Sequence, residues 1–192
     1  MGDCLMGNVR LYGSTSGYTE LAPPAVAPDG VLSLPSGTGT LLTAEGGKVL
    51  QVVRASDVTR RTTTSTSFVD VTGMSVTITP QKTTSAILVI ATSQISSVHS
   101  STSVMRTSRL SITDSSNVVI GGVTEPTFGQ ISNAGSSTQS IEVSFALFAY
   151  VLPATLSPVT YKLRFKSDDA GTTTQIKNDL YTGQLYAIEV SA

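Results

Sequence analysis

Apolar and polar residues alternate with a period of two along most of the chain after residue 66. Clear examples are the stretches Met74–Ile78, Tyr161–Ser167 and Gly183–Val190. Alternation of this kind predicts β-strands with one face in a core and the other face toward water. The stretch Ile87–Ala91 is apolar throughout, which predicts a strand that is covered on both faces.

Short turn signals separate these strands. Thr72-Gly73 predicts a hairpin connection, and the polar run Asp114–Asn117 predicts a turn before Val118–Ile120. Eight or nine strands at this spacing predict an all-β fold, an antiparallel β-sandwich that is jelly-roll-like. An immunoglobulin-like sandwich has the same pattern, but the chain has one cysteine and no tryptophan, so it lacks the Cys-Trp-Cys hallmark of antibody-type domains.

The amino-terminal part of the chain has a different pattern. Residues 1–54 are rich in turn residues such as Pro23-Pro24 and Asp29-Gly30, and they predict an extended, turn-rich segment. Residues 55–66 are polar and predict a linker, and residues 67–192 are expected to form the sandwich. The apolar residues between the turns cannot form a core of their own and need a partner. They are Tyr12, Tyr18, Val31, Leu32, Leu34, Leu41 and Leu42.

The longest predicted strand, Gln139–Leu152, is apolar on both faces toward its end. A sandwich strand ordinarily has one solvated face, so the second face needs cover. One interpretation is an interior strand that is covered by a loop. We favour the other, which is packing against copies of the same chain. The interface candidates are Ala146, Phe148, Tyr150 and Leu152, with Leu185 from the last strand.

The charge and composition exclude several classes of function. The net charge is −1 and only 13 % of the residues are charged, which argues against a nucleic-acid partner because such partners require a basic surface. The longest apolar run, Phe145–Leu152, is far shorter than the ~20 residues of a membrane-spanning helix, so no membrane insertion is expected. The single Cys4 cannot form a disulfide within the chain.

Residues that could carry chemistry are scarce. His99 is the only histidine and lies in a serine-rich stretch, and no cluster of histidine, cysteine and acidic residues has the spacing of a metal site. The pair Asp168-Asp169 predicts a turn, because the remaining ligands of a calcium loop are missing. We therefore expect no catalytic residue, no metal and no cofactor, and hence no enzyme. A carbohydrate-binding or glycan-cleaving domain is the alternative from another class, although the chain has few aromatic residues for sugar binding.

Several segments resemble fibre and structural proteins of tailed bacteriophages. These are "NVRLYGSTSGYTELAPPAVAPDGVLSLPSGTGTLLT", "TSTSFVDVTGMSVTITPQKTTSAILVIATSQI", "VTYKLRFKS" and the terminal "LYAIEVSA". The resemblance implies a homotrimeric virion protein that is assembled in the host cytoplasm. It also implies that the amino-terminal segment, with the seven apolar residues named above, binds other virion proteins. The β-domain would be similar to a tumour-necrosis-factor-like jelly roll and face outward.

The resemblance leaves two roles open. The chain has no heptads, collagen triplets or repetitive shaft, so it would form a short fibre or spike whose β-domain contacts a glycan or protein of the host surface. The alternative is a capsid or tail decoration protein that stabilises the particle without binding a receptor.

Overall fold

The computed structural model describes residues 9–12, 15–21, 48–99, 106–121, 127–131 and 138–191. The chain divides into two compact units, residues 1–42 and residues 43–192. In the first unit, strands β1 (Val9–Tyr12) and β2 (Tyr18–Leu21) pair as an antiparallel hairpin. The sequence pattern did not predict this hairpin. No helix in the described part of the chain is long and apolar enough to span a membrane.

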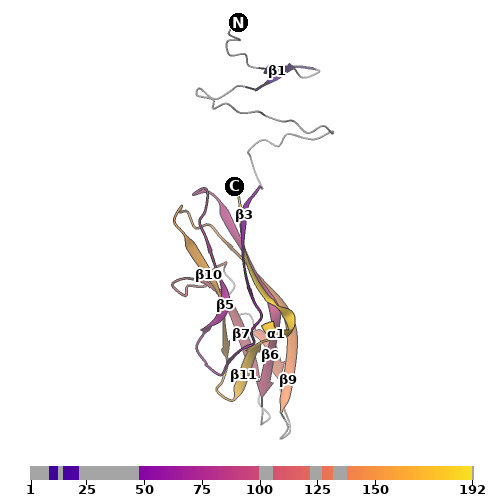
Figure 1. The fold of residues 1–192 in the computed structure, drawn as a ribbon, viewed down its shortest axis with the longest axis vertical. Helices are drawn as coiled ribbons and strands as arrows, with labels where there is room; N and C mark the ends of the chain where they lie inside the picture. Colours follow the sequence, from indigo (N-terminus) through magenta and orange to yellow (C-terminus); the bar gives the residue numbers. More distant parts are fainter. Residues whose placement is uncertain are drawn as a thin grey trace. The chain divides into compact units, whose positions relative to one another are not determined.

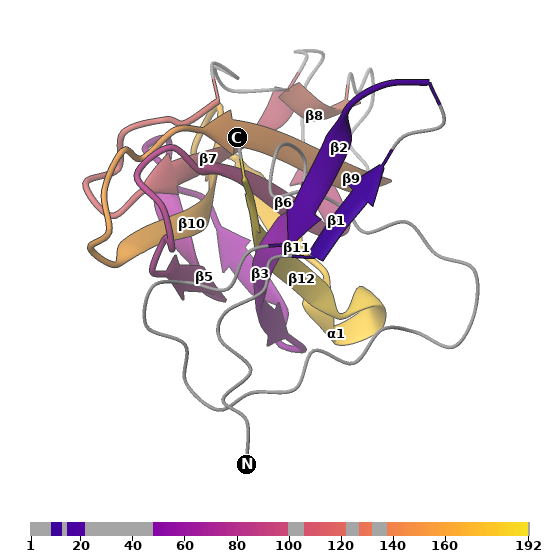
Figure 2. The same cartoon turned by 90° about the horizontal axis from the view of Figure 1, so that it is seen from above.

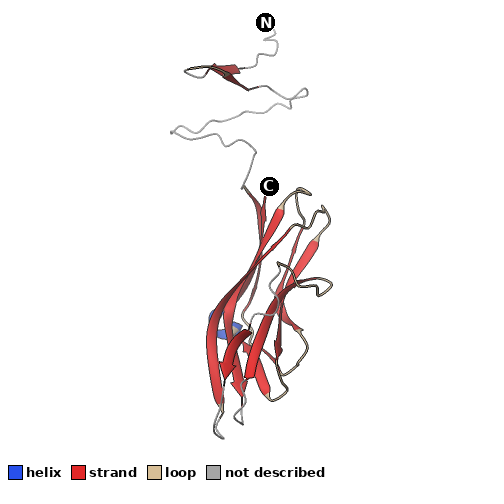
Figure 3. Cartoon of the chain, turned by 180° about the vertical axis from the view of Figure 1, so that it is seen from behind, coloured by secondary structure: helices blue, strands red, loops and turns tan. Residues whose placement is uncertain are grey.

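The second unit is a sandwich of two antiparallel sheets (Figures 1 and 3). Its strands are β3 (Val49–Asp57), β4 (Arg61–Thr63), β5 (Val69–Ile78), β6 (Ala86–His99), β7 (Arg106–Asp114), β8 (Thr127–Ile131), β9 (Gln139–Val151), β10 (Val159–Ser167), β11 (Thr172–Ile176) and β12 (Gly183–Val190). The short helix α1 (Asn178–Tyr181) connects β11 to β12.

The strand order identifies the sandwich as a jelly roll. The small sheet has the order β5-β10-β7-β8. In the large sheet, the long strand β6 is central. Along one edge, the first half of β6 pairs with β12 and its second half pairs with β11; along the other edge, β6 pairs with β9. β3 pairs with the outer edge of β12, and β4 pairs with the outer edge of β11. Apart from the short β4 and β11, the chain changes sheet at nearly every connection, so that β3, β12, β6 and β9 form one layer and the other four strands form the second (Figure 2). Two such interlocked layers of four strands are the jelly-roll arrangement.

The core lies between the two sheets and is built from the inward residues of each alternating strand. Burying a large aliphatic or aromatic side chain of this kind contributes about 1.5–3 kcal/mol. The largest fully buried apolar side chains are Met74, Ile78, Ile87, Ile95, Leu110, Leu163, Ile176, Leu185, Val71 and Val89. The prediction of an all-β antiparallel sandwich is therefore confirmed, and its jelly-roll form is distinguished from the immunoglobulin-like alternative.

Two local predictions are wrong. Thr72-Gly73 does not connect two strands, because β5 continues through it; Gly73 has φ +87°, and the pairing of β5 with β10 shifts register there, as in a β-bulge. Residues 55–66 are not a linker, because β3 pairs with β12 and β4 pairs with β11 within the large sheet. The sandwich therefore begins before residue 55, and the boundary between the two units follows Leu42.

Candidate interaction surface

The outward face of the large sheet carries two rows of mainly apolar residues that cross four strands. The first row consists of Val52, Ile188, Leu88 and Tyr150, which are aligned by the pairing of β3, β12, β6 and β9. The next row, two residues further along each strand, consists of Arg54, Tyr186, Ile90 and Phe148. Val49, at the start of β3, and Leu152, just after the end of β9, lie next to the first row. We call the two rows together with these two residues the apolar face.

The apolar face exposes large side chains at both of its margins. At the β9 margin, Phe148, Tyr150 and Leu152 are 57 %, 59 % and 61 % exposed. At the β3 margin, Val49 and Val52 are 60 % and 54 % exposed. The four residues in the middle, on β12 and β6, are half-buried by their neighbours. A contiguous exposed surface of this kind is typical of a contact site rather than of an isolated monomer.

Alternating side chains of β9 contribute to the core on one side of the sheet and to the apolar face on the other. Phe145, Leu147 and Ala149 point inward and are buried, whereas the alternating residues Phe148 and Tyr150 point outward. Inward, the Phe145 ring packs against Phe128 of β8 with centroids 5.8 Å apart. Because successive side chains of a strand alternate between faces, the unbroken apolar run in the second half of β9 covers the core and also presents a second apolar surface.

The electrostatics of the sheet change along its length. Arg54 is the only charged residue in the two apolar rows, and its guanidinium carbon lies 6.0 Å from the centroid of the Tyr186 ring. The following row is polar apart from Ala146, and it consists of Ser56, Gln184, Thr92 and Ala146. Beyond that row, the Lys177 ammonium group pairs with the Glu142 carboxylate across the same face. The apolar face therefore occupies only the half of the sheet nearest to the start of β3 and the end of β12.

The structure brings together most of the predicted interface residues. Ala146, Phe148, Tyr150 and Leu152 are all exposed along β9 and its end. Leu185 is wrong as an interface candidate, because its side chain is 0 % exposed and lies in the core. In β12 it is Tyr186 and Ile188 that point outward.

The apolar face includes residues that the sequence analysis did not name as candidates. Leu88 and Ile90 belong to the apolar run in β6 that was predicted to be covered on both faces. Val49 and Val52, by contrast, were assigned to the extended amino-terminal segment. Of the predicted virion-anchor residues, Tyr12 lies in β1 and is 74 % exposed, and Tyr18 begins β2. Val31, Leu32, Leu34, Leu41 and Leu42 lie outside the described residues.

His99 lies at the buried end of β6, in a hydrogen-bonded cluster rather than an open site. Its Nδ1 is 3.1 Å from the carbonyl oxygen of Gly171 and 3.2 Å from Oγ1 of Thr172. The Thr172 hydroxyl donates to Asp169 Oδ2 at 2.8 Å and is itself part of a fully buried side chain. In a catalytic triad the acid binds and orients the histidine. Here the Asp169 carboxylate binds the Thr172 hydroxyl instead, and this hydroxyl is buried.

The carboxylates of Asp168 and Asp169 bind neighbouring groups of the protein. Asp168 accepts a hydrogen bond from Arg109 Nε at 2.7 Å, and Asp169 Oδ1 accepts one from the backbone N–H of Gly171 at 2.8 Å. The pair therefore lies in the turn between β10 and β11, as predicted. Within the part of the chain that the structure describes, no group of three or more His, Cys, Asp and Glu residues could hold a metal ion.

Two buried carboxylates hold the edge of the large sheet in place. Burial would raise the pKa of Asp57, but a bidentate contact with Arg61 and a hydrogen bond from Asn178 outweigh it and hold the pKa below its ordinary 3.8. Burial would likewise raise the pKa of Glu189, but hydrogen bonds from the Gln51 side chain and the Gln81 backbone hold this pKa below its ordinary 4.5. Both groups fix strands and loops to one another.

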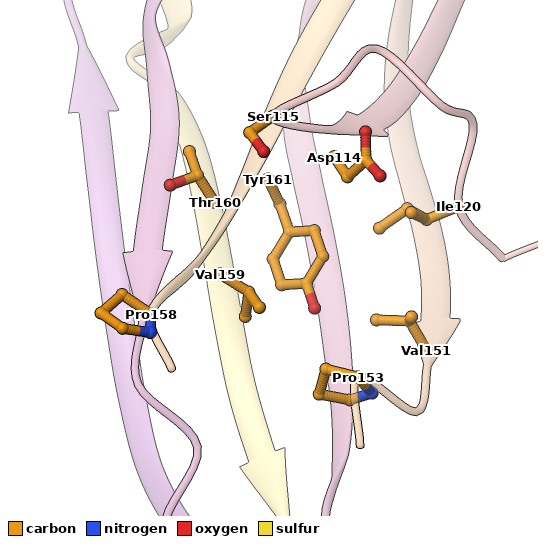
Figure 4. Close-up of a pocket in the computed structure, with 9 residues that line it drawn as sticks. All are labelled: Asp114, Ser115, Ile120, Val151, Pro153, Pro158, Val159, Thr160 and Tyr161. Carbon is orange, nitrogen blue, oxygen red and sulfur yellow. The ribbon is translucent and has the colours of Figure 1, made fainter. Parts of the chain in front are cut away.

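A cavity of about 260 Å³ opens at the end of the sandwich where β9 ends and β10 begins. Figure 4 shows the Tyr161 ring extending between Val159 and Val151, with its hydroxyl toward Pro153. Burial, together with the Asp114 carboxylate, raises the pKa of the Tyr161 phenol to about 12. The described lining includes one carboxylate and no basic side chain, so its chemistry does not favour an anionic ligand.

Comparisons with known proteins give matches only among solved structures. No family model and no curated protein matches the chain. The structure of the Gx strain of infectious bursal disease virus matches at 15 % identity over 92 % of this chain and 43 % of that chain, with a TM-score of 0.27. The VP2 subviral particle of the same virus matches at 15 % identity over 92 % and 44 %, with a TM-score of 0.30. The present chain thus spans less than half the length of the virus chains that it matches.

Proposed function

We propose that this chain is a structural virion protein that forms a short homotrimeric fibre or spike of a tailed bacteriophage. The jelly-roll domain, from residue 43 onward, provides the contact between the three copies. The amino-terminal unit binds another virion protein, and the β-domain contacts the host surface. The phage assignment rests on the sequence resemblance described above.

The observation that carries this proposal is the apolar face. Its exposed residues include two aromatic rings on β9 and the leucine that directly follows this strand, and the neighbouring strands extend the surface without a break. Left in water, such a surface favours association with any complementary apolar surface.

The first test is the mass of the purified full-length protein in solution. Multi-angle light scattering is expected to give about three times the 19.9 kDa chain mass. A monomer at micromolar concentration would contradict the proposal.

The second test separates a host-contacting spike from a decoration protein. Purified trimer added before infection is expected to compete with phage for adsorption, and imaging of the virion is expected to place the chain on the tail. A chain found across the capsid shell, with no competition for adsorption, would identify a decoration protein instead.

A further inference from the structure

We infer that the apolar face binds a second copy of this chain in a head-to-tail manner, so that the β9 margin of one copy packs against the β3 margin of the next. The inference rests on the self-association that is proposed above and specifies the surfaces that make it. The β9 margin consists of Phe148, Tyr150 and Leu152, and the β3 margin consists of Val49 and Val52.

The exposed area is large enough for a stable contact. A whole aromatic side chain presents about 150–250 Å², so Phe148 and Tyr150, at 57 % and 59 % exposure, each offer roughly 100 Å². With Leu152, the two valines and the half-buried residues between the margins, the apolar area reaches on the order of 500 Å². Together with a polar rim, this area approaches the ~800 Å² that each partner buries in a standard interface.

The chemistry of the face fits a copy of the same chain better than an unlike partner. Arg54 is the only charged residue in the two rows, and it already lies against the Tyr186 ring. Partners of different sequence are commonly selected through complementary charges, whereas contacts between identical chains are more apolar at their centre. The contact then ends before the polar row from Ser56 to Ala146.

The two margins supply the pair of different patches that the proposed trimer needs. In a closed ring, each copy contributes one patch to one neighbour and a different patch to the other neighbour. The two margins are three strand spacings apart, or about 14 Å, and they differ in shape. The β9 margin presents large aromatic side chains, and the β3 margin presents small branched ones, so the two surfaces are complementary rather than identical.

Charge substitutions at each margin of the full-length chain test the inference. Tyr150→Asp changes only the β9 margin, and Val52→Asp changes only the β3 margin. The matched controls, Ser144→Asp and Ser56→Asp, place the same charge on the same two strands and the same face, but in its polar half. The two margin variants are expected to be monomeric by light scattering with unchanged far-ultraviolet circular dichroism, and the two controls are expected to keep the wild-type mass.

Mixing the two margin variants gives the decisive result. The Tyr150→Asp chain retains an intact β3 margin and the Val52→Asp chain retains an intact β9 margin, so one good contact can form between them. Their mixture is expected to contain a heterodimer of twice the 19.9 kDa chain mass. A mixture that stays monomeric would overturn the head-to-tail contact, and trimers that persist in the single variants would overturn the whole surface. If the wild-type protein is itself a monomer, the proposed function fails as well.

Discussion

Glu189 is fully buried between the sheets, where its two carboxylate oxygens accept hydrogen bonds from different parts of the chain. Oε2 accepts from the side-chain amide of Gln51 at 2.5 Å, and Oε1 accepts from the backbone N–H of Gln81 at 2.7 Å. These contacts tie β12 to β3 and to the connection between β5 and β6. They also require the ionised form, because a protonated oxygen would present a donor to another donor.

The first prediction concerns the acid sensitivity that Glu189 confers. Because folding lowers the pKa of this carboxyl, its contribution is complete above the ordinary value of 4.5 and is lost as the pH falls through the folded value. Glu189→Gln should lower the free energy of unfolding by about 1–3 kcal/mol at pH 7, and it should make that free energy less dependent on pH below 5. Urea unfolding at several pH values measures both effects. Asp179→Asn is the comparison, because it removes a carboxylate whose pKa the contact with Arg60 also lowers, but at an exposed site. It should change the free energy of unfolding at pH 7 less than Glu189→Gln does, because exposed ion pairs contribute little.

The second prediction concerns Gly183, where even a methyl group does not fit. A Cβ at this position would lie 2.2 Å from Oδ1 of Asn178, which accepts a hydrogen bond from the Ser93 hydroxyl. Gly183→Ala should therefore destabilise the protein by roughly 1–3 kcal/mol, as overpacking of a tight site does. In the double variant with Asn178→Ala, the losses should be less than additive, because the second substitution removes the obstacle. Fully additive losses in urea unfolding would contradict this explanation.

At the scale of elements, the hydrophobic pattern predicted β6, β9, β10 and β12 closely, because each of these strands is long and has one face buried in the core. It failed at β3 and β4. The inward residues Val53 and Ala55 pack against the core, but the outward Arg54 and Ser56 that end β3 are polar, and β4 has only three residues. The end of β3 and β4 therefore resemble a linker in the sequence. The sequence prediction was also wrong at Gly73. Glycine is common in hairpin turns, but here it lies at a bulge within the continuous strand β5.

The third prediction follows from the place of β3 in the sheet. β3 pairs with β12 from Gly183 to Val190, and Asp57 at its end joins β4 and α1 through Arg61 and Asn178. A fragment of residues 43–192 should unfold at the same temperature as the full-length protein. A fragment of residues 62–192 lacks β3 and should unfold at a lower temperature or aggregate, because the edge of β12 is then uncovered. Equal unfolding temperatures for the two fragments would show that β3 is dispensable.

At the scale of the whole molecule, the sequence predicted half of the candidate site. The unbroken apolar run from Phe145 to Val151 in β9 indicates a second covered face. Which face of β12 is inward depends on register, however, and a shift of one residue exchanges the faces. Leu185 was misplaced for this reason. Val52 was missed because its strand was not recognised, so the continuity of the face across four strands became visible only in the folded sheet.

The fourth prediction concerns the force that holds the copies together. Because the two apolar rows contain a single charge, the contact should depend on apolar burial, which added salt does not screen. The mass by light scattering should therefore be the same at low and high sodium chloride concentration. Phe148→Asp, in the second row, should give a monomer at both concentrations because the contact would bury an unpaired charge. A trimer that dissociates in high salt would instead indicate a contact built on ion pairs.

The last prediction concerns the division of the chain after Leu42, which would separate attachment from assembly if the proposed function holds. The apolar face, both margins included, belongs to residues 43–192, so this fragment should form trimers without the first unit. Attachment to the particle is assigned to the first unit, so the fragment should be absent from virions that are assembled in cells producing it. Quantitative immunoblotting of purified particles, with full-length protein as the control, measures this. If the fragment is incorporated at the same copy number as the full-length chain, the contact with the particle lies in the jelly roll, and the amino-terminal unit is not the anchor.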